Sequence, residues 1–142
     1  MIVKNKLFEL TLICVLFFTV LSGCDKDGDV ILSGTWKVEV VHVDGKTITF
    51  DDKEVYLNIS KDIKEYGLVL SVNLCTGILN CHGDNGIGFE TPGCTEMCCD
   101  SDEDKQFLDM IVSVSEYEIS GVSMELSDGN RNYIRLMKVL EE

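Results

Sequence analysis

The sequence of 142 residues predicts a mainly β fold, in which an antiparallel up-and-down sheet closes or nearly closes, with one late α-helix. Two observations carry this prediction. Short runs of alternating apolar and polar residues follow one another from Ile31 to Val139, and tight turns separate them. One stretch near residues 101–114 instead has apolar residues at helical spacing.

About nine short strands are expected from this pattern. The first two form a hairpin, because Val38 and Val40 alternate with polar residues and Asp44-Gly45 supplies a two-residue turn. A second turn is expected at residues 84–86, and Pro92-Gly93 ends that run. The expected strands are residues 36–43, 46–50, 54–60, 66–73, 77–81, 87–90, 117–120, 122–126 and 132–139.

The expected helix runs from Ser101 to about Val114. Ser101 is a good N-cap, and the acidic residues 102–104 lie in the first turn, where the helix dipole favours anions. The apolar residues on one face are Phe107, Leu108, Ile111 and Val112. The acidic cluster is therefore interpreted as a helix start and not as a catalytic site.

The first 23 residues are expected to be a signal peptide. Lys4 and Lys6 precede an uncharged run, residues 10–21. As a helix this run would be roughly 18 Å long, well short of the ~30 Å hydrocarbon core of a bilayer. A cleaved leader explains it better than a membrane-spanning helix.

Residues 21–24, Leu-Ser-Gly-Cys, resemble the bacterial lipobox. The resemblance implies that Cys24 becomes the lipidated N-terminus of the mature protein, that residues 24–30 form an acidic tether, and that residues 31–140 form one domain. One acyl chain holds a protein only marginally, whereas the three chains usual for bacterial lipoproteins, palmitate among them, would suffice. The expected location is the cell envelope, at the periplasmic or surface face of the outer membrane. Acidic residues after the lipidated Cys resemble two conflicting sorting signals, Asp25 for inner-membrane retention and a charged cluster for surface display, so both membranes stay open.

The charge of the chain limits its partners. The net charge is -13, which disfavours nucleic acid and electrostatic adsorption to anionic lipid. A calcium loop starting at Asp25 is excluded, because its sixth and twelfth positions, which should be Gly and Glu, are Val30 and Trp36. The membrane contact is expected to be covalent, through the lipid on Cys24.

Five cysteines remain after the leader and the lipidated residue are set aside. Outside the cytoplasm disulfides are the default, and an odd number leaves at least one thiol over. Cys75 and Cys81 cannot pair if they share one strand, because they are then about 20 Å apart. Their partners are expected in residues 94–99, so this segment should be bonded to their strand. The disulfide candidates are Cys75, Cys81, Cys94, Cys98 and Cys99.

Zinc is an alternative use of these cysteines. The ligands would be Cys94, either Cys98 or Cys99, Cys81 and His82. The spacing from Cys75 to Cys81 does not suit a zinc knuckle, and an oxidising compartment favours disulfides. A redox role would need a C-x-x-C pair at a helix start, which the sequence does not contain. No metal or other cofactor is expected.

Several landmarks resemble the META/HslJ-like family, whose domains are lipocalin-like barrels. Residues 32–36, Leu-Ser-Gly-Thr-Trp, resemble its opening strand, and Asn73 with Gly77 resembles its central N-x-x-x-G signature. Residues 95–99, Thr-Glu-Met-Cys-Cys, followed by an acidic helix and by residues 117–121 and 124–126, resemble its closing half. The resemblance runs from about Ile31 to Val139.

The resemblance implies a cracked, lipocalin-like β-barrel in the envelope, with a loose association with stress tolerance and no catalytic residues to transfer. One departure concerns the cysteines. The family places a Cys directly before the Asn, where this chain has Val72, and its own Cys75 comes two residues after Asn73. Cys99 matches the family's second Cys, so a Cys75–Cys99 bridge is implied by analogy.

No motif for catalysis or phosphate binding is present, so an enzyme is not expected. The expected function is that of a non-catalytic envelope lipoprotein that binds an unidentified envelope protein or supports the envelope under stress. The alternative is a carrier with a small apolar ligand inside its barrel. Large residues would fill the barrel and argue against the carrier if they point inward; the candidates are Trp36, Phe50, Phe89, Phe107 and Tyr133.

Overall fold

The computed structural model describes residues 31–140 of the chain. The expected signal peptide, the lipobox with Cys24 and the acidic tether lie outside the described residues.

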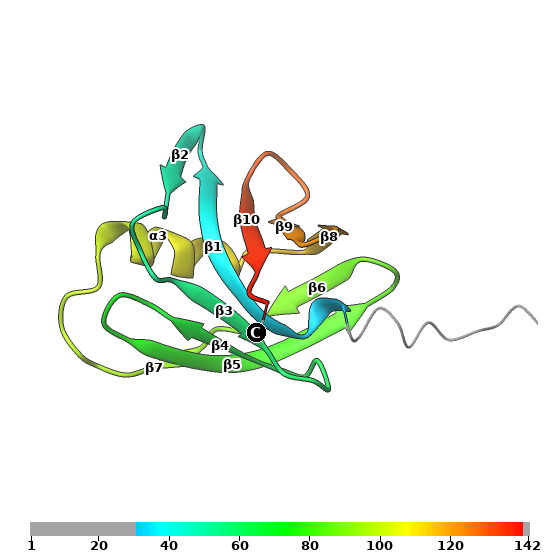
Figure 1. The fold of residues 1–142 in the computed structure, drawn as a ribbon, viewed down its shortest axis with the longest axis horizontal. Coiled ribbons are helices and arrows are strands. Elements are labelled where there is room, and N and C mark those ends of the chain that lie inside the picture. The colour runs from blue at the N-terminus through cyan, green and yellow to red at the C-terminus, as the bar shows by residue number, and fades with distance from the viewer. Residues whose placement is uncertain (1–30, 141–142) are drawn as a thin grey trace, which may run out of the picture.

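The described part of the chain forms ten strands and the helix α3 (Figure 1). The sequence led to about nine strands, and the additional one is β7, two residues long, in a segment expected to be irregular. The bounds are β1 Gly34–Val43, β2 Lys46–Thr49, β3 Tyr56–Ile59, β4 Glu65–Val69, β5 Leu74–His82, β6 Gly86–Phe89, β7 Gly93–Cys94, α3 Asp102–Ile111, β8 Glu116–Ser120, β9 Ser123–Ser127 and β10 Tyr133–Lys138.

The strands form a closed antiparallel barrel of eight strands, which confirms the predicted fold class. Neighbouring strands follow the order β10-β9-β8-β6-β5-β4-β3-β1, and β1 pairs with β10 to complete the circle. The two extra strands, β2 and β7, extend the pairing of β1 and β5. α3 connects β7 to β8 and packs against β1 and β10.

β1 pairs with two strands, β3 and β2, along one edge because it bends. Residues 34–37 pair with β3 and residues 40–43 pair with β2, while β10 runs along the other edge. A β-bulge between Val38 and Val40 provides the bend. Asp44 and Gly45 both have positive φ, 51° and 76°, as a type I′ turn requires, so the predicted Asp-Gly hairpin is confirmed.

The barrel is joined most weakly between β6 and β8. Strand pairing there is limited to Gly86 opposite Glu116. Two further backbone bonds lie beside it, from Ile87 N to Ser115 O (3.0 Å) and from Tyr117 N to Asn85 O (2.9 Å). The two strands are therefore held together near one end only, which is the geometry of a cracked barrel.

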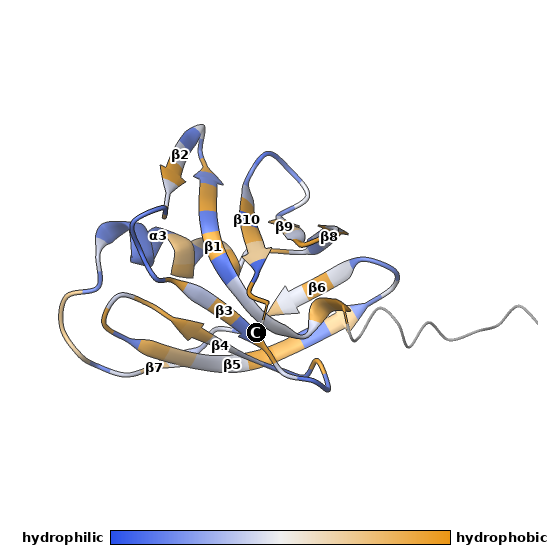
Figure 2. Ribbon diagram, viewed as in Figure 1, coloured by the Kyte–Doolittle hydropathy of each residue, from blue (hydrophilic) through white to orange (hydrophobic). Residues whose placement is uncertain are grey.

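Large side chains fill the barrel. Trp36, Phe50 and Phe107 are fully buried, and Phe89 is nearly so. Phe50 and Phe107 meet edge to face at 6.3 Å, and the indole Nε1 of Trp36 donates to Leu32 O at 2.9 Å. Figure 2 shows apolar and polar residues alternating along β1, in agreement with an inner and an outer face of this strand.

Tyr133, a candidate for the barrel interior, does not point inward. β10 buries Ile134 and Leu136, so the period of two puts Tyr133 on the outer face. There its ring stacks on His42 at 5.1 Å, and the guanidinium of Arg135 lies 5.3 Å from the ring centre. The core instead gains Tyr66, which meets Phe89 edge to face at 5.0 Å.

α3 begins as predicted and ends earlier. The hydroxyl of Ser101 accepts from Asp104 N at 3.1 Å, which is the expected N-cap. Phe107 and Ile111 are buried as expected, together with Met110. Val112, expected on the buried face, is an exposed C-cap residue because the helix ends at Ile111.

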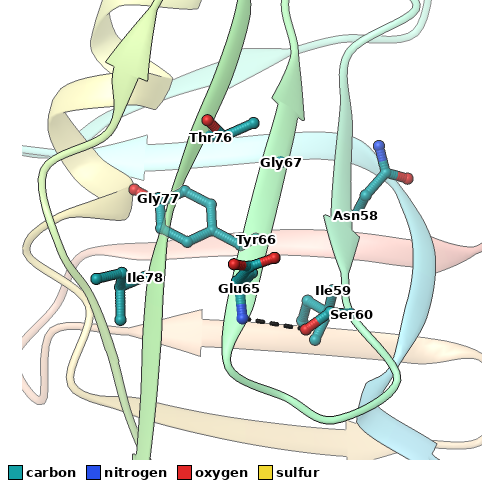
Figure 3. Close-up of a pocket in the computed structure, with 9 residues that line it drawn as sticks. All are labelled: Asn58, Ile59, Ser60, Glu65, Tyr66, Gly67, Thr76, Gly77 and Ile78. Carbon is teal, nitrogen blue, oxygen red and sulfur yellow. Dashed lines mark hydrogen bonds between the residues drawn. The ribbon is translucent and has the colours of Figure 1, made fainter.

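The ring of Tyr66 occupies the space above Gly77 (Figure 3). The two residues are directly opposite each other in β4 and β5. A Cβ atom at position 77 would come within 2.5 Å of the ring. The ring cannot easily move away, because its hydroxyl donates to Glu90 O and the side chain is 2% exposed. Burial raises the pKa of Tyr66 to about 12, and the charge of Glu90 adds to the effect.

We therefore expect Gly77→Ala to destabilise the protein by about 2 kcal/mol, because the new methyl group overpacks a filled site. Gly67→Ala is the matched control in the neighbouring strand, where the nearest atom would be 3.6 Å from a new Cβ. Urea unfolding at constant m-value measures both. Equal stability of the two variants would contradict the role given to Gly77.

Candidate functional site

The segment between β7 and α3 brings the cysteines of this domain together. This segment, residues 94–100, is called here the cysteine loop. It lies against the start of β5, where Thr95 N donates to Leu74 O (2.9 Å) and Leu74 N donates to Thr95 Oγ1 (3.1 Å). The loop therefore continues, through a side chain, the pairing that β7 begins.

A disulfide joins Cys75 of β5 to Cys94 of β7, across directly opposite positions. This confirms that the loop is bonded to the strand that carries Cys75 and Cys81. The cross-link closes a separation of 19 residues in sequence, and in the chain-entropy model it contributes about 3 kcal/mol to stability.

Two expectations about the other cysteines are wrong. The Cys75–Cys99 bridge implied by family analogy does not form, because Cys75 is bonded to Cys94 and Cys99 is a free thiol. Cys81 was expected to find its partner in the cysteine loop, but Cys98 is also a free thiol. The reason is geometric: β7 pairs with β5 at Cys75 and Thr76, whereas Cys81 lies opposite Ile87 of β6.

The zinc ligand set is likewise not assembled. Cys94 is used in the disulfide, and Cys81 and His82 lie near the other end of β5, about 20 Å along the strand from Cys75. Within residues 31–140, no group of three or more His, Cys, Asp or Glu side chains is placed to hold a metal ion.

The side-chain amide of Asn73 fixes the middle of the loop. Its Nδ2 donates to Met97 O (2.8 Å) and to Asp100 Oδ2 (2.6 Å). Its Oδ1 accepts from Thr95 Oγ1 (2.8 Å) and from Met97 N (2.9 Å). Asn73 is 6% exposed, so the amide uses its two donor hydrogens and both acceptor sites inside the protein. It gives Met97 the two backbone hydrogen bonds that a strand neighbour would give.

Carboxylates of the loop and of α3 hold the turn that precedes β5. Asp100 Oδ1 accepts from Val72 N and from Asn73 N, both at 3.2 Å. Asp104 Oδ2 accepts from Ser71 N at 3.1 Å, and this side chain is fully buried. Three successive N–H groups of the turn thus point at two carboxylates. This network connects the turn, the loop and the start of α3.

The loop exposes three consecutive sulfur-containing side chains, Met97, Cys98 and Cys99. Cys99 has a φ of 87°, in the left-handed region that a residue other than Gly rarely adopts. A hydrogen bond between the two thiols raises the pKa of Cys99, and slight burial adds to the effect. The free thiols therefore lie next to each other on the surface.

A second surface feature is a hollow on the outer face of β3, β4 and β5 (Figure 3). It lies over Gly67, which has no side chain, between Asn58 and Thr76 on the neighbouring strands. The exposed side chain of Ile78 forms part of its lining. The hollow offers a shallow contact surface with polar and apolar parts.

The fold and the loop together define a small antiparallel barrel whose interior is filled and whose chemically distinctive groups lie on its surface. The chain belongs to the META domain family, whose model matches residues 29–139. Among solved structures, the barrel is similar to a DUF4847 family protein from Bacteroides vulgatus, with a TM-score of 0.59 and 12% identity over 82% of this chain and 99% of that one. Comparison with curated proteins finds no match.

The structure gives physical reasons for the two residues of the N-x-x-x-G signature. Asn73 holds the cysteine loop, and Gly77 makes room for Tyr66. Sequence analysis did not identify Asp100 or Tyr66 as structural partners of these residues. Asp100 directly precedes the N-cap Ser101, and this position was a signal that could have pointed to its structural role. Nothing local distinguishes Tyr66 from other strand residues.

We expect Asn73→Ala to lower the free energy of unfolding by about 3 kcal/mol, because it leaves backbone groups of the loop without partners. Asn80→Ala is the control, since that exposed amide makes one hydrogen bond, to Glu90, and its loss should cost less than about 0.5 kcal/mol. Urea titration of the oxidised proteins measures both changes. A loss at Asn73 no larger than that at Asn80 would show that the amide does not hold the loop.

Proposed function

We propose that this protein is a lipid-anchored envelope protein whose META domain binds a partner protein at its outer surface, without catalysis and without a ligand inside the barrel. The observation that carries the proposal is the filled interior. Trp36, Tyr66, Phe89 and the smaller buried apolar residues of the barrel strands form one core cluster in the space that a carrier would keep for its ligand. Binding is then left to the outer surface.

The outer face of β5 is the best candidate for that contact. Leu74 and Ile78 are 57% and 52% exposed, which is high for large apolar residues on a strand. Across the sheet, Leu74 lies opposite Val69, and Val69 lies opposite Tyr56. This row of apolar and aromatic side chains, with the hollow over Gly67 beside it, suits an apolar patch on a protein partner better than a charged ligand.

The start of the domain is firmly attached, as an anchored module requires. The ammonium group of Lys138 donates to Ile31 O (2.8 Å) and to Ser33 O (2.5 Å), and it lies 4.7 Å from the centre of the Trp36 ring. Burial lowers the pKa of Lys138. A lipid on Cys24 would then be joined to a fixed point of the barrel through residues 24–30, which span at most about 24 Å when extended.

The membrane contact in this proposal is covalent. The net charge of -13 opposes adsorption to anionic lipid and binding to nucleic acid. None of the helices in residues 31–140 is long and apolar enough to cross a bilayer.

For the anchor, we expect the full chain extracted from membranes to begin at Cys24 and to carry fatty acyl groups there. Cys24→Ala should abolish the added mass, because the thiol that accepts the lipid is gone. Cys14→Ala, in the leader, is the matched control and should keep the modification. Intact-mass measurement shows both the first residue of the mature protein and its acyl groups. Mature protein that starts at another residue or lacks fatty acid would contradict the proposed lipid anchor.

For the partner, we expect the membrane-extracted protein to retain one envelope protein after cross-linking. The double variant Leu74→Glu/Ile78→Glu should capture at least about tenfold less of this protein. A charge in the centre of an apolar contact costs a few kcal/mol. Val112→Glu is the control, an exposed apolar residue at the end of α3. The urea midpoint of each protein shows that it is folded. Equal capture of the partner by the unchanged protein, the double variant and Val112→Glu would contradict the proposed surface.

A further inference from the structure

Three sulfur donors stand in consecutive positions on the solvent side of the cysteine loop. Met97 is 61% exposed, and Cys98 and Cys99 are exposed free thiols. Exposure of a large apolar side chain next to two thiols is not explained by packing. It leaves a thioether and two thiols accessible from the same stretch of chain.

The loop is held on both sides of these donors. On one side, the backbone N–H and C=O of Met97 are both bonded to the amide of Asn73. On the other side, the carboxylate of Asp100 is bonded to two backbone N–H groups and to the same amide. The residues between these two attachments are Cys98 and Cys99. A site on a fixed frame loses little conformational freedom when it binds a ligand.

The two thiols leave neighbouring residues of the loop. The Cα atoms of Cys98 and Cys99 are about 3.8 Å apart across one peptide bond, and Cys99 has a positive φ of 87°. Both thiols are exposed, so one ion can reach them together. Met97 has a long, flexible side chain that is free of packing contacts over most of its surface. Its thioether is therefore accessible to an ion bound at the neighbouring thiols.

Two other donors of the loop are already engaged. Both oxygens of Asp100 accept hydrogen bonds, and Cys94 is in the disulfide with Cys75. The carboxylate of Glu96 is exposed, but it is a single hard donor beside three consecutive sulfur atoms, so the loop offers a metal ion mainly sulfur. Thiolate and thioether ligands select soft ions, above all Cu(I), whereas zinc in proteins takes four ligands that this loop does not supply.

We propose that Met97, Cys98 and Cys99 form a binding site for one soft monovalent metal ion of the Cu(I) class. Two sulfur–metal bonds form at the thiolates of Cys98 and Cys99, and the two thiol protons pass to water. The thioether of Met97 completes a three-coordinate site. The metal enters and leaves as the monovalent ion, so the step needs no oxidant or reductant. The proposal does not depend on the lipid anchor.

The site is separate from the structural disulfide. Cys75 is a buried core residue of β5, and its bond to Cys94 stays intact when the metal binds. Metal binding should therefore change neither the disulfide nor the fold.

The test is a titration of the full membrane-extracted chain with Cu(I), held by a chromogenic Cu(I) chelator in ascorbate without oxygen. We expect one Cu(I) per folded chain to be taken from the chelator. Cys98→Ser and Cys99→Ser should each weaken binding by at least about 100-fold, and Met97→Leu by about tenfold, because they remove a thiolate and a thioether. Cys81→Ser, which changes an exposed cysteine of β5, should leave the affinity unchanged.

X-ray absorption at the copper edge should show sulfur neighbours only, and urea midpoints should show that each variant folds. The proposal is overturned if the chain takes no Cu(I) from the chelator, or if the double variant Cys98→Ser/Cys99→Ser still binds it. It is also overturned if Cys81→Ser weakens binding as much as the loop variants do, since the metal would then lie elsewhere.

Discussion

The buried amide of Asn73 is the interaction on which the arrangement of this surface depends. β7 pairs with β5 over only two residues, and the backbone bonding between them ends with the bond from Thr95 N to Leu74 O. Beyond that point, a side chain replaces the missing strand and bonds both backbone groups of Met97. Because the amide also bonds Asp100, the start of α3 is held to the same turn of the sheet. One side chain thus joins three pieces of chain, beside the hydrogen bonds that Asp100 and Asp104 make to the turn before β5.

This arrangement separates two roles of cysteine within a short segment. Cys94 lies where the loop still follows the sheet, directly opposite Cys75, and it forms the disulfide. Cys98 and Cys99 lie beyond the amide and remain free on the surface. The separation follows from the backbone path, since Cys75 and Cys94 lie directly opposite each other with their Cα atoms 4.0 Å apart, within reach of a bridge. Apolar side chains fill the barrel interior, and the free thiols lie outside it. For this reason the proposals for function concern the outer surface.

The sequence predicted the repetitive parts of the fold well, because alternation and turn residues are local signals. The Asp44-Gly45 hairpin, the Ser101 cap and the inward Trp36 follow from nearest neighbours in the chain. What it could not supply was register between distant strands. Cys75 pairs with Cys94 and not with Cys99 because of how β7 aligns on β5, which no local pattern encodes. For Tyr133, a candidate for the interior, the local signal was sufficient, because the alternation of its own strand, with Ile134 buried, assigns it to the outer face.

Amide hydrogen exchange at the cysteine loop tests the central claim most directly, namely that Asn73 holds this loop as a strand would. NMR of the oxidised protein should find the Met97 N–H protected to the level of sheet amides, because it is bonded to a buried oxygen. The N–H groups of Cys98 and Cys99, outside that bond, should exchange much faster. Exchange of Met97 at the rate of its two cysteine neighbours would contradict the account.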